Sequence, residues 1–305
     1  MSAPRVAIGV DVGGTKIESV LLDSTGGEHG RHRVATPRGD YEGTIRAISE
    51  MVRRAASSAG AGACELVEAI GVGGPGSVSP RTELHRNANS TCLNGRRFRE
   101  DLAAALGRPV VFANDADCLA LSESFDGAAR DARVVFAVIL GTGCGGGIVV
   151  DRSLLQGRNG IVGEWGHSPL PRAGTEDEAL PSRRCWCGRV DCLEAWISGP
   201  ALEREFGAPV GRVGASAAES GVAIARLARR LARALAGVVN LLDPDAIVLG
   251  GGVSNAPGLV EALPPLVAPL VFSDSFDTPI VRALHGDSSG VRGAARLVLS
   301  GPITP

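Results

Sequence analysis

Two segments of the chain share one pattern of apolar and small residues. Val6–Asp23 and Phe136–Asp151 each contain an apolar run, a turn rich in glycine and a second apolar run. This pattern is typical of a β-hairpin whose turn uses glycine, because glycine adopts positive φ angles without steric cost. The sequence therefore predicts the same hairpin twice.

Each predicted hairpin is followed by a helix and then by a short buried strand. The strands are expected at Ala69–Ser79 and Ala246–Asn255, where an apolar run ends in glycines. Apolar residues at helical spacing precede them over Tyr41–Ala59 and Val222–Leu242. The second helix also carries four arginines that we expect on its solvent-exposed face: Arg226, Arg229, Arg230 and Arg233.

The repeat predicts two related α/β halves that face each other across a ligand-binding cleft. We place the first half at residues 1–116 and the second at residues 117–289. The second half is longer between its hairpin and its glycine-ended strand. The excess matches an irregular stretch at about residues 152–200, which we interpret as an insertion.

Composition and charge narrow the class of protein. The chain has 305 residues, of which 44% are hydrophobic and 21% charged, which is typical of a globular protein with about two domains. The net charge of −2 argues against nucleic acid as a partner. No apolar run approaches the ~18 residues of a membrane span, and the start of the chain lacks a signal-peptide pattern, so we expect a cytoplasmic protein without membrane contact.

Four of the seven cysteines lie in apolar or glycine-rich stretches and are expected in the core: Cys64, Cys92, Cys118 and Cys144.

Three glycine-rich loops are candidates for binding phosphate. Backbone N–H groups approach an oxyanion closely where no Cβ intervenes, and threonine hydroxyls add donors. Asp11, at the end of the first predicted strand, is a candidate ligand for a metal ion that bridges phosphates. For any single loop a plain tight turn is an equal alternative, and the repetition favours a nucleotide. The candidate residues are Gly13, Gly14 and Thr15 in the first loop, Gly141, Thr142 and Gly143 in the second, and Gly250, Gly251 and Gly252 in the third.

A pair of polar residues follows another predicted strand, at residues 107–113. Asn114 and Asp115 stand where this strand gives way to a helical run. An aspartate there can cap the helix. It can also serve as a general base at the floor of the cleft, accepting a proton from a substrate hydroxyl, with Asn114 binding a neighbouring hydroxyl.

The insertion contains a group of residues with metal-ligand chemistry. One histidine and three cysteines, His167, Cys185, Cys187 and Cys192, match the ligands of a closed structural zinc site. Their C-x-C-x4-C spacing is not that of a zinc finger, and three buried cysteines without metal remain an alternative. A metal would cross-link a segment poor in apolar residues. Glu164 and Glu194 flank the group and are candidates for sugar hydroxyls or, alternatively, ordinary surface charges.

Taken together, these motifs resemble the ROK family of repressors and sugar kinases over essentially the whole chain. The resemblance rests on DVGGTK, GGPGSVS, ANDAD, ILGTGCGGG, GEWGH, CWCG with CLE, and LDPDAIVLGGGVSN. Within the family the chain looks most like bacterial fructokinases of the manno(fructo)kinase type, on RHRVATPRGDY, NANSTCLNG, GEWGHSPLP and HGDSSGVRGAA.

The resemblance implies a fold, a reaction and a set of roles. The fold is the duplicated α/β fold of actin-like ATPases (ribonuclease H-like), with a zinc-bearing insertion and a final helix, residues 290–305, that packs back on the first half. The reaction is transfer of the γ-phosphate of ATP to the 6-hydroxyl of D-fructose, with Mg²⁺, and a homodimer is expected. Asp115 matches the catalytic base, and Asp11 the residue that orients Mg–ATP. The residues that match sugar ligands are Asn114, Glu164, His167 and Glu194; His167 would also bind zinc, and Gly250–Gly252 would lie on the adenosine side.

The chain departs from the family pattern at three positions. Asp191 stands where the family usually has glycine, Asp117 where it has asparagine, and Cys92 where tryptophan is common.

Two alternative functions remain. A glucokinase, mannokinase or N-acetylglucosamine kinase of the same family is the first alternative. A sugar-responsive transcriptional repressor is the second, and it is disfavoured because the first strand begins at about Val6, which leaves no room for a helix-turn-helix domain.

Overall fold

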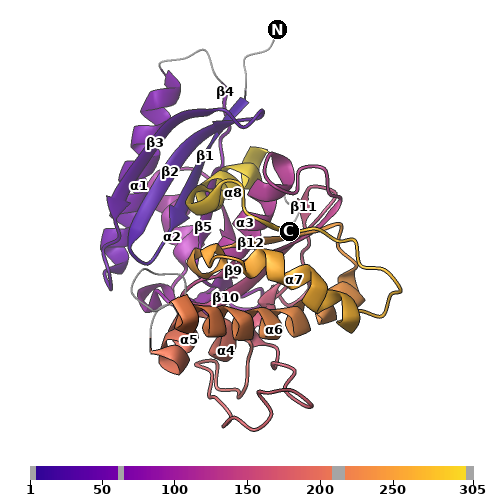
Figure 1. The fold of residues 1–305 in the computed structure, drawn as a ribbon. Helices are drawn as coiled ribbons and strands as arrows, with labels where there is room; N and C mark the ends of the chain where they lie inside the picture. Colours follow the sequence, from indigo (N-terminus) through magenta and orange to yellow (C-terminus); the bar gives the residue numbers. More distant parts are fainter. Residues whose placement is uncertain (1–4, 61–64, 208–216, 300–305) are drawn as a thin grey trace.

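Two sheets with the same strand order form the framework of the molecule (Figure 1). The computed structural model describes residues 5–60, 65–207 and 217–299. In each sheet three antiparallel strands are followed by two strands parallel to the innermost one. The first sheet has the order β3 (Glu28–Ala35), β2 (Lys16–Asp23), β1 (Arg5–Val12), β5 (Ile70–Gly74) and β8 (Val110–Asn114), with the short β4 (Glu65–Leu66) beside β1. The second has the order β11 (Ser153–Leu154), β10 (Cys144–Val150), β9 (Val134–Leu140), β12 (Ala246–Gly250) and β13 (Ile280–Arg282).

The predicted repeat is therefore present as a repeated topology. β1 pairs with β2 and β9 pairs with β10 as the two predicted hairpins. The strands expected after each helix are β5, parallel to β1, and β12, parallel to β9. This duplicated α/β arrangement is that of the actin-like ATPase fold.

Helices cover both faces of both sheets and fill the space between them. One face of the first sheet packs on α1 and its other face on α8, while α6 and α7 pack on the far face of the second sheet. Between the sheets, α3 and α8 share one apolar core with residues of β1, β2, β9 and β12. The helices are α1 (Tyr41–Gly60), α2 (Phe98–Leu106), α3 (Asp115–Phe125), α4 (Glu194–Ile197), α5 (Gly199–Phe206), α6 (Ala217–Leu242), α7 (Leu259–Val267) and α8 (Ser289–Leu299).

The last helix, α8, approaches the first sheet more closely than side chains would permit. A Cβ on Gly9 of β1 would collide with the carbonyl of Val291, and one on Gly71 of β5 with that of Ala294. These glycines therefore allow the backbone of α8 to pack directly on the sheet. Residues 300–305, at the end of the predicted terminal segment, lie outside the described part of the chain.

Glycine has a different role in the hairpin turns from the one predicted. None of Gly13, Gly14, Gly141 and Gly143 has a positive φ, so the turns do not depend on glycine for that reason. A Cβ at Gly14 or Gly141 would meet no atom within 4 Å. Because glycine has no side chain, the backbone at these two positions directly faces open space.

The expected solvent-exposed arginine face of α6 is wrong for two of its four residues. Arg230 is fully buried, and its Nη2 lies 2.7 Å from Oδ1 of Asp177, which is also fully buried. Arg233 is largely buried and pairs with the same carboxylate at 2.5 Å. Arg226 and Arg229 are partly exposed, with side chains 28% and 42% accessible, and each also pairs with a carboxylate. The sequence pattern could not show this because the insertion covers the polar side of α6 and supplies the partner.

Two smaller expectations concern cysteines and membranes. Cys118 and Cys144 are buried as predicted, Cys92 is partly exposed, and Cys64 lies outside the described residues. No helix among the described residues has the length and apolar character needed to cross a lipid bilayer.

Candidate active site

A cleft of about 1080 Å³ is lined by the predicted base, Asp115, and by the predicted sugar-binding residues. Both halves of the chain contribute to its walls, which confirms the expected cleft between them. The predicted residues that line it are Gly14, Asn114, Asp115, Thr142, Gly143, Glu164, His167 and Glu194. Those that do not line it are Asp11, Gly13, Thr15, Gly141, Gly250–Gly252 and the three cysteines Cys185, Cys187 and Cys192.

Asp115 is the first residue of α3, directly after β8. The residue that caps the helix is Asn114, whose side-chain oxygen accepts a hydrogen bond from the N–H of Ala116 at 2.8 Å. Oδ1 of Asp115 accepts from the same N–H at 2.9 Å. Since the cap is provided by its neighbour, capping does not explain Asp115, and its Oδ2 is left for another partner.

The side chain of Asn114 makes hydrogen bonds within the protein that the sequence did not indicate. Besides capping α3, its amide nitrogen donates to the carbonyl of Gly76 at 3.3 Å. These bonds fix the junction between β8 and α3, and through it the position of Asp115. Contact of Asn114 with a substrate hydroxyl stays a prediction.

The electrostatic environment of Asp115 suits a group that accepts a proton near neutral pH. Burial raises its pKa to about 6, and the negative charge of Glu164 acts in the same direction. Backbone N–H groups, that of Ala116 among them, oppose the shift. A carboxylate with a raised pKa is a stronger base than an ordinary aspartate, as general base catalysis requires.

Asp11 lies at the end of β1, beside the first glycine loop. Burial raises its pKa to about 7, and the nearby charge of Asp115 adds to the shift. The Cα of Gly290, at the start of α8, faces it so closely that a Cβ would lie 3.1 Å from its carboxyl carbon. Among the residues that the structure describes, no arginine forms an ion pair with this carboxylate, and a buried carboxylate of this kind suits a divalent cation, because the cation would stabilise its ionised form.

The first glycine loop is held from behind by polar side chains. The hydroxyl of Thr36 donates to the carbonyl of Gly13 at 2.6 Å, and Nε of Arg38 donates to that of Gly14 at 3.1 Å. The carbonyl groups are thereby engaged away from the cleft, which Gly14 lines.

The second glycine loop is tied to Glu194. One carboxylate oxygen of Glu194, Oε2, accepts from the N–H of Cys144 at 2.9 Å. A Cβ on Gly143 would lie 2.7 Å from the same oxygen, so the carboxylate packs directly against the loop. Glu194 is therefore part of the cleft wall and is not a loose surface charge.

The third glycine loop supports the second. Gly251 has φ +84°, and a Cβ on it would collide with the carbonyl of Leu140, at the end of β9. This is the position in the three loops where the backbone conformation itself requires glycine. Contact of Gly250–Gly252 with the adenosine part of a nucleotide stays a prediction.

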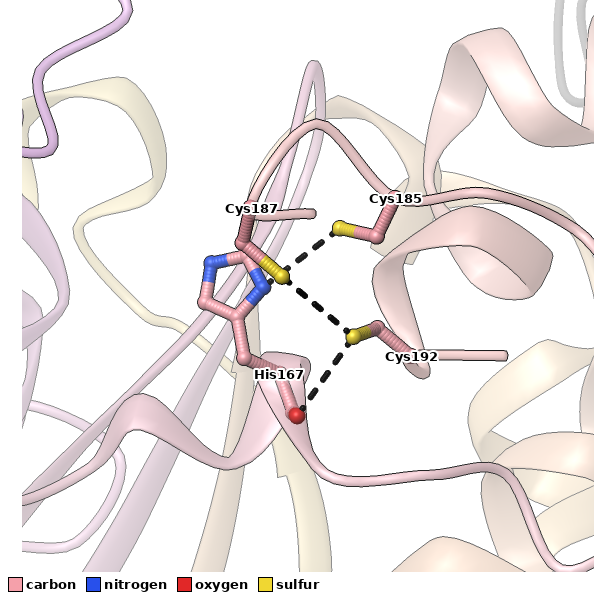
Figure 2. A group of neighbouring side chains, drawn as sticks. All are labelled: His167, Cys185, Cys187 and Cys192. Carbon is pink, nitrogen blue, oxygen red and sulfur yellow. Dashed lines mark hydrogen bonds between the residues drawn. The ribbon is translucent and has the colours of Figure 1, made fainter. Parts of the chain in front are cut away.

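His167, Cys185, Cys187 and Cys192 converge on one point (Figure 2). Their potential ligand atoms all lie within 4.8 Å of one another. Nδ1 of His167 is 3.6 Å from Sγ of Cys185, and the sulfurs of Cys187 and Cys192 are 3.6 Å apart, too far for a disulfide of about 2.05 Å. Three thiols and an imidazole at these separations fit a tetrahedral zinc ion.

The orientation of His167 allows it a second contact. Its Nδ1 faces the sulfurs, while Nε2 points to the other side and lies 4.0 Å from Oε2 of Glu164. Both residues line the cleft. The ring thus separates the cysteine cluster from the cavity.

Several polar or aromatic residues of the cleft wall were not predicted as site residues. Among them are Asn87, Asn89, Asp117 and Trp186. The NANSTCLNG stretch and the CWCG motif contain three of them and could have suggested a role. Asp117 carries a signal of its own, because burial and the charge of Asp115 raise its pKa to about 7.

The sequence and the fold are similar to those of known sugar kinases. A sequence profile of the ROK family matches residues 7–300. An N-acetyl-D-glucosamine kinase from Photobacterium profundum is 36% identical over 301 residues, which cover 95% of this chain and 98% of that protein. The crystal structure of a ROK hexokinase from Thermus thermophilus has a TM-score of 0.81 and 34% identity, covering 96% of this chain and 97% of that one. A ROK glucokinase from Streptomyces griseus, in complex with glucose and AMPPNP, has a TM-score of 0.76 and 29% identity, covering 97% of this chain and 100% of that one. On these grounds, the chain belongs to the ROK family.

Proposed function

We propose that this protein is an ATP-dependent sugar kinase that phosphorylates the 6-hydroxyl of N-acetyl-D-glucosamine. The cleft geometry supports the reaction, and the relatives support the sugar. The sequence motifs favoured D-fructose, with glucose, mannose or N-acetylglucosamine as the alternative. Proteins 34% to 36% identical over nearly their whole length are named N-acetyl-D-glucosamine kinases, which favours N-acetylglucosamine.

The observation that carries the reaction is the placement of Asp115. Its Oδ1 is held by the N–H of Ala116, and its Oδ2 remains available in a cleft that two glycine loops approach. Oδ2 would accept the proton of the sugar hydroxyl as the hydroxyl oxygen attacks the γ-phosphate. Phosphoryl transfer requires mainly positioning and charge stabilisation, which suits a site with one base and bare backbone loops.

Asp11 would hold the magnesium ion of Mg–ATP. When bound, that ion neutralises charge on the phosphates. The protein's own contribution is the buried carboxylate at the end of β1 and the N–H groups of the first two glycine loops. Glu164, His167 and Glu194 would orient the sugar from the opposite wall.

A structural zinc ion in the His167–Cys192 cluster is part of the proposal. It would connect the stretch 164–168 to the loop 185–192, and so hold one ring nitrogen of His167 while the other faces the cleft. A closed four-ligand site of this kind contributes to folding and leaves no open position for chemistry.

A substrate panel with coupled detection of ADP tests the proposed sugar. N-acetyl-D-glucosamine, glucose, mannose and fructose would be compared at equal concentrations, with the Asp115→Asn protein as the blank. We expect the highest kcat/KM for N-acetyl-D-glucosamine. A higher value for fructose would restore the sequence prediction, and no turnover of any sugar would overturn the kinase proposal.

The zinc proposal is tested by metal content. We expect one zinc ion per chain in the wild type, and loss of both zinc and thermal stability in Cys187→Ala. Cys92→Ala, outside the cluster, is the matched control and should keep its zinc. Unchanged zinc in Cys187→Ala would refute the ligand assignment.

A further inference from the structure

The side chain of Trp186 combines high exposure with specific polar contacts. It lies between two of the proposed zinc ligands, Cys185 and Cys187, and 62% of its surface is exposed. The other tryptophans differ: Trp196 is fully buried and Trp165 partly buried. A large exposed indole at the wall of a cleft calls for an explanation beyond core packing.

Trp186 makes two contacts with proposed sugar ligands. Its indole N–H donates to Oε1 of Glu194 at 2.5 Å. Its ring meets that of His167 edge to face, with centroids 5.1 Å apart and an interplanar angle of 84°. All three side chains line the cleft.

Glu194 is thereby held at both oxygens by different parts of the second half. Oε1 accepts from Trp186 in the cysteine loop, and Oε2 accepts from the N–H of Cys144, next to the second glycine loop. The carboxylate links the cysteine loop to the proposed phosphate loop. Without the indole donor, the carboxylate of Glu194 could rotate, because only the hydrogen bond from the N–H of Cys144 would orient it.

We propose that Trp186 is a positioning residue for the sugar, acting through the hydrogen bond from its indole N–H to Glu194. The bond keeps the Glu194 carboxylate in one orientation before the sugar arrives, so that less conformational freedom is lost on binding. The inference rests on the proposed sugar-kinase function, but not on which sugar is the best substrate.

Trp186→Phe tests the proposal, because phenylalanine keeps a ring beside His167 and removes the N–H donor. With the best sugar of the panel, we expect the sugar KM to rise about tenfold, as for loss of a hydrogen bond to a charged group. The KM for ATP, kcat, zinc content and melting temperature should stay near the wild-type values. An unchanged sugar KM would overturn the proposal, and so would a rise accompanied by loss of zinc or stability, which would indicate a purely structural role.

Trp165→Phe is the matched control. It also removes an indole donor from the second half, since Nε1 of Trp165 donates to the carbonyl of Gly145 at 3.1 Å, but this side chain does not line the cleft. We expect its sugar KM to match that of the wild type. A tenfold rise here as well would show that the effect is not specific to Glu194.

A double-mutant cycle with Glu194→Ala, which removes the acceptor of the indole N–H, tests the route through Glu194. If Trp186 acts through that carboxylate, adding Trp186→Phe to Glu194→Ala should change the sugar KM by less than about twofold. Effects that simply multiply would show that Trp186 acts independently and would overturn the proposed route. A wild-type protein inactive on every sugar would instead contradict the proposed function itself.

Discussion

Two regions of the molecule contain buried or partly buried carboxylates whose pKa values are shifted in opposite directions. Where α6 meets the insertion, Asp177 is fully buried and pairs with Arg230 and Arg233, which hold its pKa below the usual range against the effect of burial. Asp115 in the cleft and Asp11, which lies near it at the end of β1, have raised pKa values, with burial as the main cause. None of the ion pairs found among the described residues involves either of these two carboxylates, although the charge of Lys16 partly opposes the rise in the pKa of Asp11.

The difference separates structural carboxylates from those available for chemistry. A carboxylate neutralised by two guanidinium groups has little affinity left for a proton or a cation. One desolvated without such a partner retains both affinities, and this instability is a common property of functional sites. The same residue type thus stabilises one region and leaves the other reactive. Three substitutions test this comparison.

Asp115→Asn should have the largest effect. We expect kcat to fall about a thousandfold or more, because the amide cannot accept the proton of the sugar hydroxyl. Stability should not fall, since Asn keeps an oxygen for the N–H of Ala116 and removes an unpaired buried charge. Steady-state kinetics and thermal unfolding at pH 8 would measure both effects. Near wild-type kcat would exclude Asp115 as the base, and a lower melting temperature would place it among the structural carboxylates.

Asp177→Ala should have the opposite character. Arg230 keeps Glu205 as a second carboxylate partner, but Asp177 is its only fully buried one among the described residues, and breaking a buried pair costs about 3–5 kcal/mol of unfolding free energy. Urea unfolding would measure the loss. The control is Glu176→Ala, which breaks the partly exposed pair with Arg229 and should cost at most about 1 kcal/mol. Similar costs for the two variants would contradict the structural role of the buried pair.

Asp117→Asn should produce the smallest effect, and one that depends on pH. The folded-state pKa of Asp117 is raised to about 7, above its ordinary value of 3.8, so its contribution to stability is present at low pH and lost as the pH rises towards 7. The variant lacks this loss, and we expect it to be more stable than the wild type at pH 8 and nearly equal at pH 4.

The measurement for Asp117 is the melting temperature of both proteins between pH 4 and pH 8. Asp131→Asn serves as the control, because that side chain is 93% exposed and should give a difference independent of pH. A constant difference for Asp117→Asn would mean that its carboxylate is not destabilised in the folded protein.

Much of the fold followed from local patterns in the sequence. The helix expected at Tyr41–Ala59 is found at Tyr41–Gly60, because helical periodicity is a property of consecutive residues. The two hairpins were predictable for the same reason. Arg230 was not, since its burial depends on which distant segment covers α6, and no periodicity contains that information.

Some features of the candidate site could also be predicted from the sequence, and others could not. His167 and the three cysteines could be recognised because their side-chain chemistry is distinctive wherever the chain places them. The capping role of Asn114 and the contact of Trp186 with Glu194 depend on the geometry of a junction and an irregular loop. Residue type alone does not determine such contacts.

The direct packing of α8 on Gly9 and Gly71 has a consequence for biosynthesis. Chains are made from the amino end, and amino-terminal segments generally fold first. Here β1 and β5 are translated early, whereas the helix that covers them is the last described helix to leave the ribosome. One face of the first sheet therefore stays uncovered until residues 289–299 have been translated, and the nascent protein cannot complete its amino-terminal half before α8 has formed.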